Sequence, residues 1–506
     1  LCVLGDGELP WVEILDHVRV HDGELVRAQL GATRGLAYLS ASDEMEFTGY
    51  SKPIPAETNP FPDYALMEQG LFGEKELMAL YFKPVKGNDW FGRDPRTGEA
   101  RRLALIASAW VGKGCVARCT FCQRFCQGYR VFDLGAFDSY LAELKARHGV
   151  GFFVVAGENF GLPREFAYKV AETLKKHDML WTAGAARCTN FKPEDYRFFR
   201  DCGCVGIKFG VESGSNRILT VMEKRFKLED VRKAIEQATA VGLYAPVSFC
   251  IGMPGETDES ICETGRFLGE MYKLQGIHPV GVFYALALPG AALYEYGQLQ
   301  GVIGTSPEDE EEYLTYVSDK DTSKDFYVNM SGSSNRHAFF WDHLLFYEAM
   351  RVYHSGRAAH PSRAPAVPEG EAENTRVSRP FRIGDIVRQF PLRRLAYLFF
   401  CEPVGTLNKV LCRSRAGTLL PRWLLYPLMR NLLYAEYCLH VGFRRICSFF
   451  VKDEWFALRR KYATRACRHK IVPDVSLRVI NEQLRKQVRP PETLSERNQA
   501  ILYQGR

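Results

Sequence analysis

The sequence predicts an α/β protein built around a parallel sheet of six strands. Six short apolar runs, rich in Val, Ile, Phe and Ala, lie at residues 103–110, 152–156, 180–186, 205–211, 245–251 and 280–288. Such runs are typical of strands that are buried on both faces, as in parallel sheets. Amphipathic stretches separate them, and this strand–helix alternation suits right-handed crossovers. A partial barrel and an open flat sheet fit the pattern equally well.

Two of the intervening stretches carry apolar stripes at helical spacing and have recognisable ends. The stripes consist of Phe166, Val170 and Leu174 in one stretch, and of Leu228, Val231, Ile235, Ala238 and Val241 in the other. Pro163 precedes the first stripe, where the first turn of a helix tolerates proline, and Gly242 follows the second as a stop signal. We therefore expect a helix in each stretch.

Composition divides the 506-residue chain into six parts. We expect the remnant of an N-terminal α/β domain with its junction at 1–65, a linker at 66–102, the core barrel at 103–305, an extension of the core at 306–355, a linker rich in Pro, Ala, Glu and Ser at 356–380, and a mainly helical region at 381–506. The chain begins at Leu1 inside an apolar run, so we expect an N-terminal truncation.

The net charge of +6 is unevenly distributed. Residues 381–506 hold 24 Lys and Arg against 9 Asp and Glu, a net charge of +15, and the remainder therefore carries −9. An anionic partner should meet the chain in this C-terminal region. Three interpretations of the region stay open: a helical cap over the barrel with a solvated basic face, a peripheral contact with anionic lipid, and nucleic-acid binding. The last is disfavoured because no RNA-binding module is recognisable.

The cysteines are the strongest chemical signal. Fifteen are present, mostly scattered, which suits a reducing cytoplasm better than a secreted disulfide framework. One tight group, Cys115, Cys119 and Cys122, follows the first predicted strand with the spacing CxxxCxxC. Three thiolates can each hold one iron of a cubane cluster and leave the fourth iron open, as a catalytic site requires. Zinc ligation and unligated cysteines remain the alternatives, and Cys126 is either a neighbouring thiol or a fourth ligand that would close the cluster.

The spacing CxxxCxxC, with the aromatic Phe121 before the third cysteine, resembles the signature of the radical S-adenosylmethionine (SAM) superfamily. The resemblance implies a partial (β/α)6 barrel, a 4Fe-4S cluster on Cys115, Cys119 and Cys122, and SAM chelated to the open iron. It also implies reductive cleavage of SAM to a 5′-deoxyadenosyl radical, with the electron supplied by a donor such as flavodoxin or ferredoxin. The cofactor carries this chemistry, while the protein positions it and excludes water.

Motifs at further strand ends extend the resemblance to about residue 295. The positions that would contact SAM by family analogy are Phe121, Gly157, Glu158, Glu212, Ser213, Gly252 and Pro254. The second strand ends in Ala-Gly-Glu where the family has Gly-Gly-Glu, so that match is partial. Each position also has an ordinary structural interpretation: a strand-end carboxylate, a capped turn, a strand–helix turn, or core packing for Phe121. No catalytic residue is assigned beyond the cluster and the SAM site.

The N-terminal fragment resembles the junction of the subfamily in which a cobalamin-binding domain precedes the radical SAM core. The resemblance rests on Gly-Asp-Gly-Glu at 5–8, Gly-Leu-Ala-Tyr at 35–38 and Asn-Pro-Phe-Pro-Asp at 59–63. The cobalamin motif Asp-x-His-x-x-Gly does not occur, so cobalamin remains only a possible cofactor. The subfamily implies methyl transfer, or cyclisation or rearrangement, of a small-molecule or lipid-like substrate.

Two rival functions make different demands on the sequence. A radical SAM methylthiotransferase acting on tRNA should carry a second cysteine triad and a compact basic β-barrel, and neither is recognisable. A non-catalytic iron–sulfur electron carrier or sensor should have four ligands and no SAM motifs. The sequence therefore favours a cytoplasmic radical SAM enzyme with possible peripheral membrane contact and disfavours a nucleic-acid partner.

Overall fold

The structure of this protein is a computed structural model. It describes residues 1–40, 42, 44–51, 54–55, 61–65, 81–83, 94–99, 105–123, 128–278, 280–318, 328–355, 420–451, 461–462, 464–468, 471 and 474–487. Cys126 and the linker expected at 356–380 lie outside these residues, as does most of the linker expected at 66–102.

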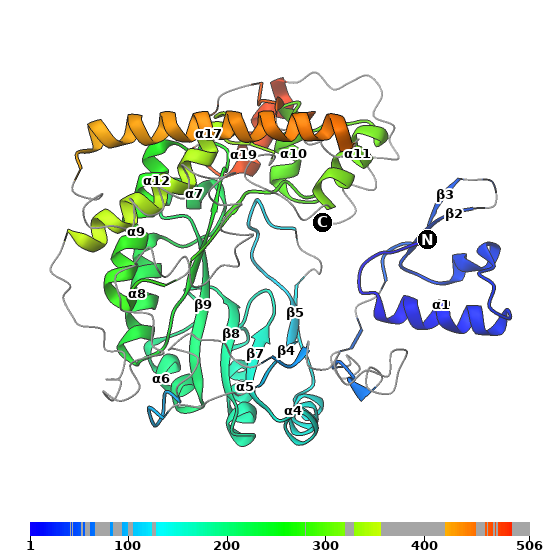
Figure 1. Ribbon diagram of the computed structural model, residues 1–506. Coiled ribbons are helices and arrows are strands. Elements are labelled where there is room, and N and C mark those ends of the chain that lie inside the picture. Colours follow the sequence, from blue (N-terminus) through cyan, green and yellow to red (C-terminus); the bar gives the residue numbers. More distant parts are fainter. Residues whose placement is uncertain are drawn as a thin grey trace. The chain divides into compact units, whose positions relative to one another are not determined.

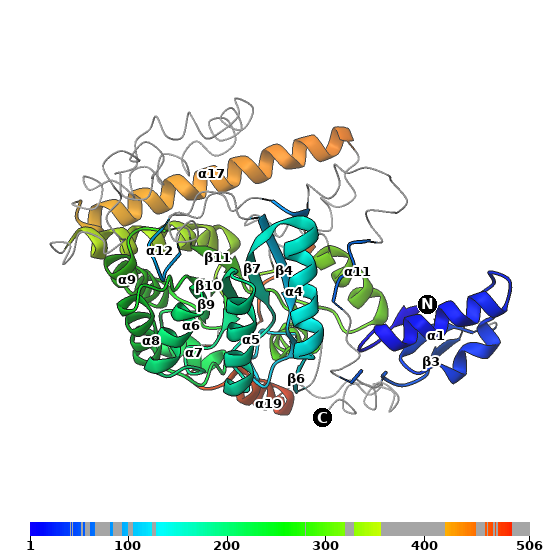
Figure 2. The same cartoon turned by 90° about the horizontal axis from the view of Figure 1, so that it is seen from below.

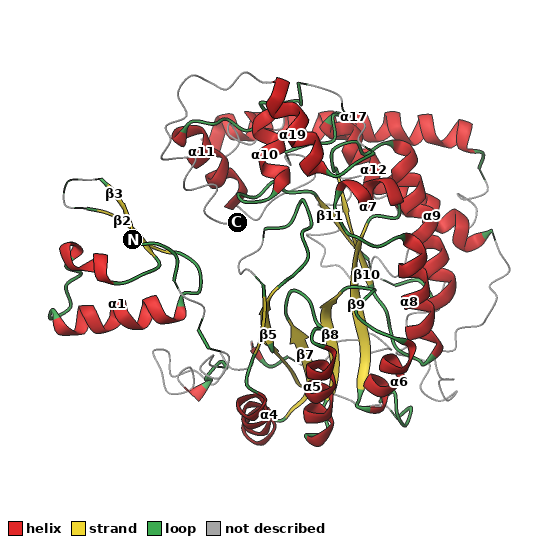
Figure 3. Cartoon of the chain, turned by 180° about the vertical axis from the view of Figure 1, so that it is seen from behind, coloured by secondary structure: helices red, strands yellow, loops and turns green. Residues whose placement is uncertain are grey.

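Six strands form the central sheet in the described part of the chain. They are β4 (Leu105–Trp110), β7 (Val150–Ala156), β8 (Leu180–Ala186), β9 (Cys204–Glu212), β10 (Val247–Ile251) and β11 (Gly281–Tyr284). The sheet order is β11-β10-β9-β8-β7-β4, so neighbours in the sheet are successive strands of this set. Figure 1 labels β4, β7, β8 and β9 of this sheet, and Figure 3 labels β10 and β11. The sequence prediction of an α/β fold with a partial (β/α)6 barrel is confirmed, and each of the six apolar runs contains one of these strands.

Helices connect the strands, as parallel pairing requires. These are α4 (Leu134–His148), α5 (Arg164–Lys176), α6 (Pro193–Asp201), α7 (Asn216–Val221), α8 (Leu228–Ala240) and α9 (Asp258–Gln275), and α10 (Ala292–Leu299) follows the last strand, β11. Both helices predicted from apolar stripes are present, as α5 and α8. Pro163 directly precedes α5, and Gly242 follows α8 with φ of 83°, a left-handed conformation that favours glycine.

The chain divides into two compact units, and β9 contributes residues to both. One unit comprises Leu1–Val116, Arg124–Lys208 and Val241–Tyr244, and the other comprises Ala117–Gln123, Phe209–Ala240 and Ala245–Arg506. The first unit includes a small N-terminal fold of β1 (Cys2–Val3), α1 (Glu8–Val20), the 3-10 helix η1 (Arg27–Ala32), β2 (Leu36–Leu39) and β3 (Met45–Phe47). Its antiparallel sheet has the order β1-β2-β3. Ile14, Leu30, Leu36 and Tyr38 form its core.

The second unit continues beyond the sheet into further helices. They are α11 (Pro307–Ser318), α12 (Asn335–His354), α17 (Arg422–Val451) and α19 (Leu477–Gln487) (Figure 3). α12 packs against α9, and α17 packs along α12 (Figure 2). Within the described residues the C-terminal region is therefore mainly helical, as predicted. No helix in the described ranges is both long enough and apolar enough to span a membrane.

Candidate active site

A short hairpin closes the base of the loop that carries the three cysteines. β5 (Gly112–Gly114) pairs antiparallel with β6 (Tyr129–Val131), and Cys115 follows β5 directly. Glycine is needed at position 112, because a Cβ there would lie 2.6 Å from the carbonyl oxygen of Arg130. Burial raises the pKa of Tyr129 to about 12, and the nearby Cys115 contributes in the same direction. The hairpin thus fixes where the cysteine loop leaves the sheet.

The three cysteines of the motif are free of disulfide bonds. Cys115 and Cys119 are half-buried and Cys122 is exposed. Cys115 belongs to the first compact unit, and Cys119 and Cys122 belong to the second. Across the described residues, no three or more His, Cys, Asp or Glu side chains are grouped closely enough for a single metal ion. A cubane cluster differs from such a site because each thiolate binds a different iron.

Thr120 anchors the loop between the second and third cysteines, and the sequence analysis missed it. Its side chain is fully buried. Its backbone N–H donates to the carbonyl of Met222 at 3.0 Å, its Oγ1 donates to the carbonyl of Val221 at 2.9 Å, and its carbonyl accepts from the N–H of Leu293 at 2.9 Å. The loop is therefore tied to the end of α7 and to the start of α10 within the second unit.

Gly157 and Glu158 follow β7 in the first unit, as predicted. Gly157 has φ of 144°, a backbone conformation that only glycine adopts readily. A Cβ at this position would face the carbonyl oxygen of Gly112 on β5. The half-buried Glu158 thus begins its turn beside the strand that leads to Cys115. Asn159, which comes next, is almost fully buried, and its side-chain oxygen accepts from the amide of Asn190 at 2.8 Å. These contacts hold the strand end rigid.

Glu212 ends β9 in an unusual backbone conformation. Its φ is 72°, in the left-handed region that non-glycine residues rarely adopt. The register between β9 and β10 shifts at this point, because Ser248 pairs with Gly210 and Phe249 pairs with Glu212. Such irregularities redirect a side chain at the end of a strand. The strained backbone at Glu212 therefore helps to set the direction of its side chain.

Lys224 faces Glu212, and the sequence analysis did not identify it. It is only 5% exposed, and its Nζ lies 3.7 Å from Oε1 of Glu212. The ammonium also lies 5.9 Å from the ring centre of Phe121 and 5.4 Å from that of Phe226. Both neighbours of Lys224 in sequence, Glu223 and Arg225, have positive φ, so the lysine sits at the tip of a sharp turn. This turn brings a buried cation to the aromatic residue of the cysteine motif.

Ser213 stabilises the turn that follows Glu212. It is buried, and its Oγ accepts from the N–H of Ser215 at 3.2 Å and lies 3.5 Å from Oγ1 of Thr264. The next residue, Gly214, must lack a Cβ, because one would lie 2.4 Å from Cα of Thr264 on α9. Ser213 therefore supports the turn that follows Glu212.

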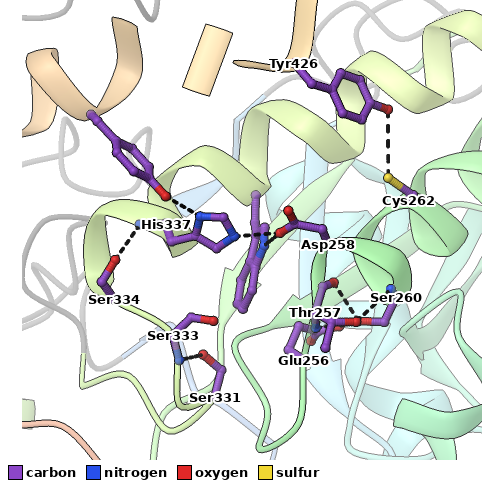
Figure 4. Close-up of polar contacts among 12 residues, drawn as sticks. Glu256, Thr257, Asp258, Ser260, Cys262, Ser331, Ser333, Ser334, His337 and Tyr426 are labelled. Carbon is purple, nitrogen blue, oxygen red and sulfur yellow. Dashed lines mark hydrogen bonds and ion pairs between the residues drawn. The ribbon is translucent and has the colours of Figure 1, made fainter. Parts of the chain in front are cut away.

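Gly252 and Pro254 lie in the buried turn after β10, as predicted. Gly252 has φ of 90°, and Glu256 closes the turn with its N–H donating to the carbonyl of Met253 at 3.0 Å. The carboxylate of Glu256 accepts from Oγ of Ser260 at 2.7 Å (Figure 4). Burial raises the pKa of Glu256 to about 7, against the opposing effect of that hydrogen bond. The carboxylate thus ties the turn to the first turn of α9.

The start of α9 is in turn joined to α12 and α17. Oδ1 of Asp258 lies 2.6 Å from Nε2 of His337 and accepts from Nε1 of Trp341 at 2.7 Å (Figure 4). Burial pushes the pKa of Asp258 upward, but these hydrogen bonds outweigh it and leave the pKa below its ordinary value. The other ring nitrogen of His337 bonds the hydroxyl of Tyr434 on α17. This polar chain fixes the inner face of α17.

The N-terminal Gly-Asp-Gly-Glu motif supplies carboxylates to the hairpin below the cysteines. Asp6 forms an ion pair with Arg130, and Glu8 forms one with Lys113. Lys113 and Arg130 are partners across the β5–β6 pair. The motif therefore forms ion pairs with the hairpin within the first unit, in addition to the tight turn that its glycines permit.

The residues fit a cluster and SAM in their chemistry. Three cysteines outside disulfides lie on a loop anchored at its base and at Thr120. Within the second unit, the buried ammonium of Lys224 and the carboxylate of Glu212 offer complementary charges beside Phe121. SAM carries a carboxylate, an ammonium and ribose hydroxyls, which are the partners that such charges require.

Part of the chain is similar to known proteins. Residues 111–268 match the model of the Radical SAM superfamily. An uncharacterised methyltransferase of Pyrococcus horikoshii is 28% identical over 218 residues, 42% of this chain and 46% of the relative. The anaerobic magnesium-protoporphyrin IX monomethyl ester cyclase of Cereibacter sphaeroides is 29% identical over 277 residues, 51% of this chain and 41% of the relative. The chain thus spans less than half the length of either relative.

Among solved structures, the cobalamin-dependent SAM radical enzyme OxsB, with aqua-cobalamin and SAM bound, is similar with a TM-score of 0.45 and 13% identity. The match covers 91% of this chain and 67% of OxsB. The matched family model begins just before the cysteine loop and ends within α9, so it includes the cysteines, the ends of β7, β9 and β10, and Lys224. On this match, residues 111–268 are similar to the radical SAM superfamily.

Proposed function

We propose that this chain is a radical SAM enzyme that cleaves SAM reductively and acts on a small-molecule or lipid-like substrate. The observation that carries the proposal is the pairing of Lys224 with Glu212 beside Phe121, the aromatic residue of the cysteine motif. A buried lysine is costly unless a partner stabilises its charge. A SAM carboxylate bound next to the cluster would give Lys224 a second anionic partner besides Glu212.

The chain's own residues have separable tasks in this proposal. Cys115, Cys119 and Cys122 hold the cluster, which when bound supplies the electron for SAM cleavage. Lys224 orients the SAM carboxylate, and Glu212 accepts hydrogen bonds from ribose hydroxyls or the SAM ammonium. Glu158 holds the SAM ammonium, and the turn at Gly252 and Pro254 lines the adenine. Thr120 keeps the cysteine loop in place.

Reductive SAM cleavage can be tested before the substrate is known. Anaerobically reconstituted protein, given dithionite and SAM, should release 5′-deoxyadenosine and methionine slowly, and chromatography measures both. The unreconstituted protein serves as the control and should release neither. Cluster-loaded protein that neither binds SAM nor yields 5′-deoxyadenosine would favour the alternative of an iron–sulfur carrier or sensor.

For the reaction itself we propose the cobalamin-linked branch of the family, with methyl transfer, cyclisation or rearrangement as its chemistry. The ion pairs of Asp6 and Glu8 with the hairpin support this, because they join the junction motif to the base of the cysteine loop. Flavodoxin or ferredoxin is the proposed electron donor. A methylthiotransferase acting on tRNA remains the second candidate reaction.

We also propose a peripheral contact between α17 and an anionic membrane surface. Exposed apolar side chains recur along one side of α17, and they are Leu424, Leu428, Leu432, Leu439 and Ile446. This stripe extends about 33 Å at the rise of an α-helix. Trp423 next to it is 76% exposed, and the one acidic residue of α17, Glu436, is buried. Apolar stripes with nearby arginines are typical of helices that lie in a membrane interface.

Vesicle co-sedimentation tests this contact. The protein should sediment with vesicles containing anionic phospholipid and much less with neutral ones, because arginine–lipid attraction contributes about 1 kcal/mol per charge. The double variant Leu428→Glu/Leu432→Glu should lose the binding. The matched control is Leu314→Glu, the same change at an exposed leucine of α11. Absence of vesicle binding by the unaltered protein, or equal loss in the control, would contradict the proposal.

A further inference from the structure

The C-terminal helix α19 is built into the same unit as the second and third cysteines. Leu477, Ile480 and Leu484 are buried on one face, and they belong to a core cluster against which Phe121 packs. These residues are spaced three and four apart, so one side of the helix is apolar. A helix that only covered the surface would not share a core with the aromatic residue of the cysteine motif.

A buried asparagine joins α19 to the residues that hold Thr120. The side-chain amide of Asn481 donates to the carbonyl of Ala292 at 2.9 Å and to Oε2 of Glu295 at 3.2 Å. Leu293, between them on α10, donates its N–H to the carbonyl of Thr120. The start of α10 therefore binds the cysteine loop on one side and α19 on the other.

Arg478 makes a second and more direct connection. Its Nη2 donates to the carbonyl of Arg118, the residue before Cys119, at 3.3 Å. Its Nε lies 3.5 Å from Oε2 of Glu223, the residue before Lys224. Ser476, at the start of the helix, donates its hydroxyl to the other carboxylate oxygen of Glu223. One arginine thus holds the cysteine loop and the Lys224 turn at the same time.

We propose that Arg478 is a positioning residue that keeps the cysteine loop and the Lys224 turn in fixed relation. This inference rests on the proposed function, since it gives α19 a role at the proposed cluster and SAM site. A planar guanidinium suits the task, because it donates a hydrogen bond to the carbonyl of Arg118 while its charge attracts Glu223, whereas a lysine ammonium is a single point charge. The turn at Lys224 needs such support, since Glu223 and Arg225 both have positive φ.

Hydrogen exchange of the cluster-free protein tests the proposal without relying on activity. In Arg478→Ala, amide exchange should become about five- to tenfold faster in residues 117–123 and in residues 222–226, as expected when hydrogen bonds that close a local opening are lost. In Arg478→Lys, the exchange rates of these two segments should lie between those of Arg478→Ala and those of the unaltered protein. The matched control is Arg485→Ala, because Arg485 lies on the same helix and forms an ion pair with Glu295 on α10.

A second measurement uses the reconstituted protein. Iron release to a chelator should be several times faster in Arg478→Ala than in Arg485→Ala, with equal iron content at the start. Unchanged exchange in both segments, or equal acceleration by the two variants, would overturn the proposal. Failure of the unaltered protein to take up iron would instead count against the proposed cluster, while the exchange result on the cluster-free protein would still decide the role of Arg478.

Discussion

Alanine at Cys115, Cys119 or Cys122 should abolish cluster assembly, the largest effect that we expect from any substitution in this chain. A cubane cluster held by three thiolates cannot replace a lost ligand from the loop without rearrangement. After anaerobic reconstitution, the unaltered protein should hold about four irons per chain, and each variant should hold close to none. Iron analysis and the visible absorption of the cluster measure the loss.

Two further cysteines serve as controls for this experiment. Cys438 is exposed on α17, so Cys438→Ala tests whether removing any accessible thiol lowers the iron content. It should leave the iron content unchanged, and so should Cys126→Ala if three ligands suffice. Loss of the cluster in Cys126→Ala would mean a fourth ligand and no open iron, which would contradict the proposed SAM chemistry.

The sheet was predictable from the sequence because its signals are local. Each strand is an apolar run of a few residues, and each predicted helix shows a stripe and a terminating residue within about four turns. The cysteine spacing and the strand-end motifs are local as well, since the ligands of the cluster lie within eight residues of one another. Local patterns of this kind determine where the chain forms strands, helices and the cysteine loop.

The supporting residues could not be predicted because their partners are distant in sequence. Thr120 is bonded to Val221 and Met222, about 100 residues away, and Arg478 is bonded to Arg118 across 360 residues. Lys224 resembles a solvated lysine in a charged stretch until the turn places it beside Phe121. The positive φ values that create this turn belong to Glu and Arg rather than to Gly, so composition offered no signal.

Lys224→Met should weaken SAM binding about 10- to 100-fold while leaving the cluster intact. The methionine side chain retains most of the length and apolar stem of lysine, so packing between Phe121 and Phe226 should persist. What is lost is a charge-assisted hydrogen bond to the SAM carboxylate, which contributes about 1.5–3 kcal/mol in a desolvated site. Equilibrium dialysis with SAM under anaerobic conditions measures the affinity.

The loss of SAM affinity should result from the missing ammonium of Lys224 and not from the change in net charge. Lys227→Met removes a lysine three residues away that is exposed, so it should leave the SAM affinity unchanged. Glu212→Gln should weaken binding by a smaller factor, because the amide still accepts a hydrogen bond but no longer carries the charge that attracts the SAM ammonium.

If Lys224→Met binds SAM as tightly as the unaltered protein, the lysine instead stabilises the fold through Glu212. Thermal unfolding of Lys224→Met and Glu212→Gln, without SAM, tests that role, because loss of either partner of a structural ion pair leaves the other without its counter-charge and lowers the unfolding temperature.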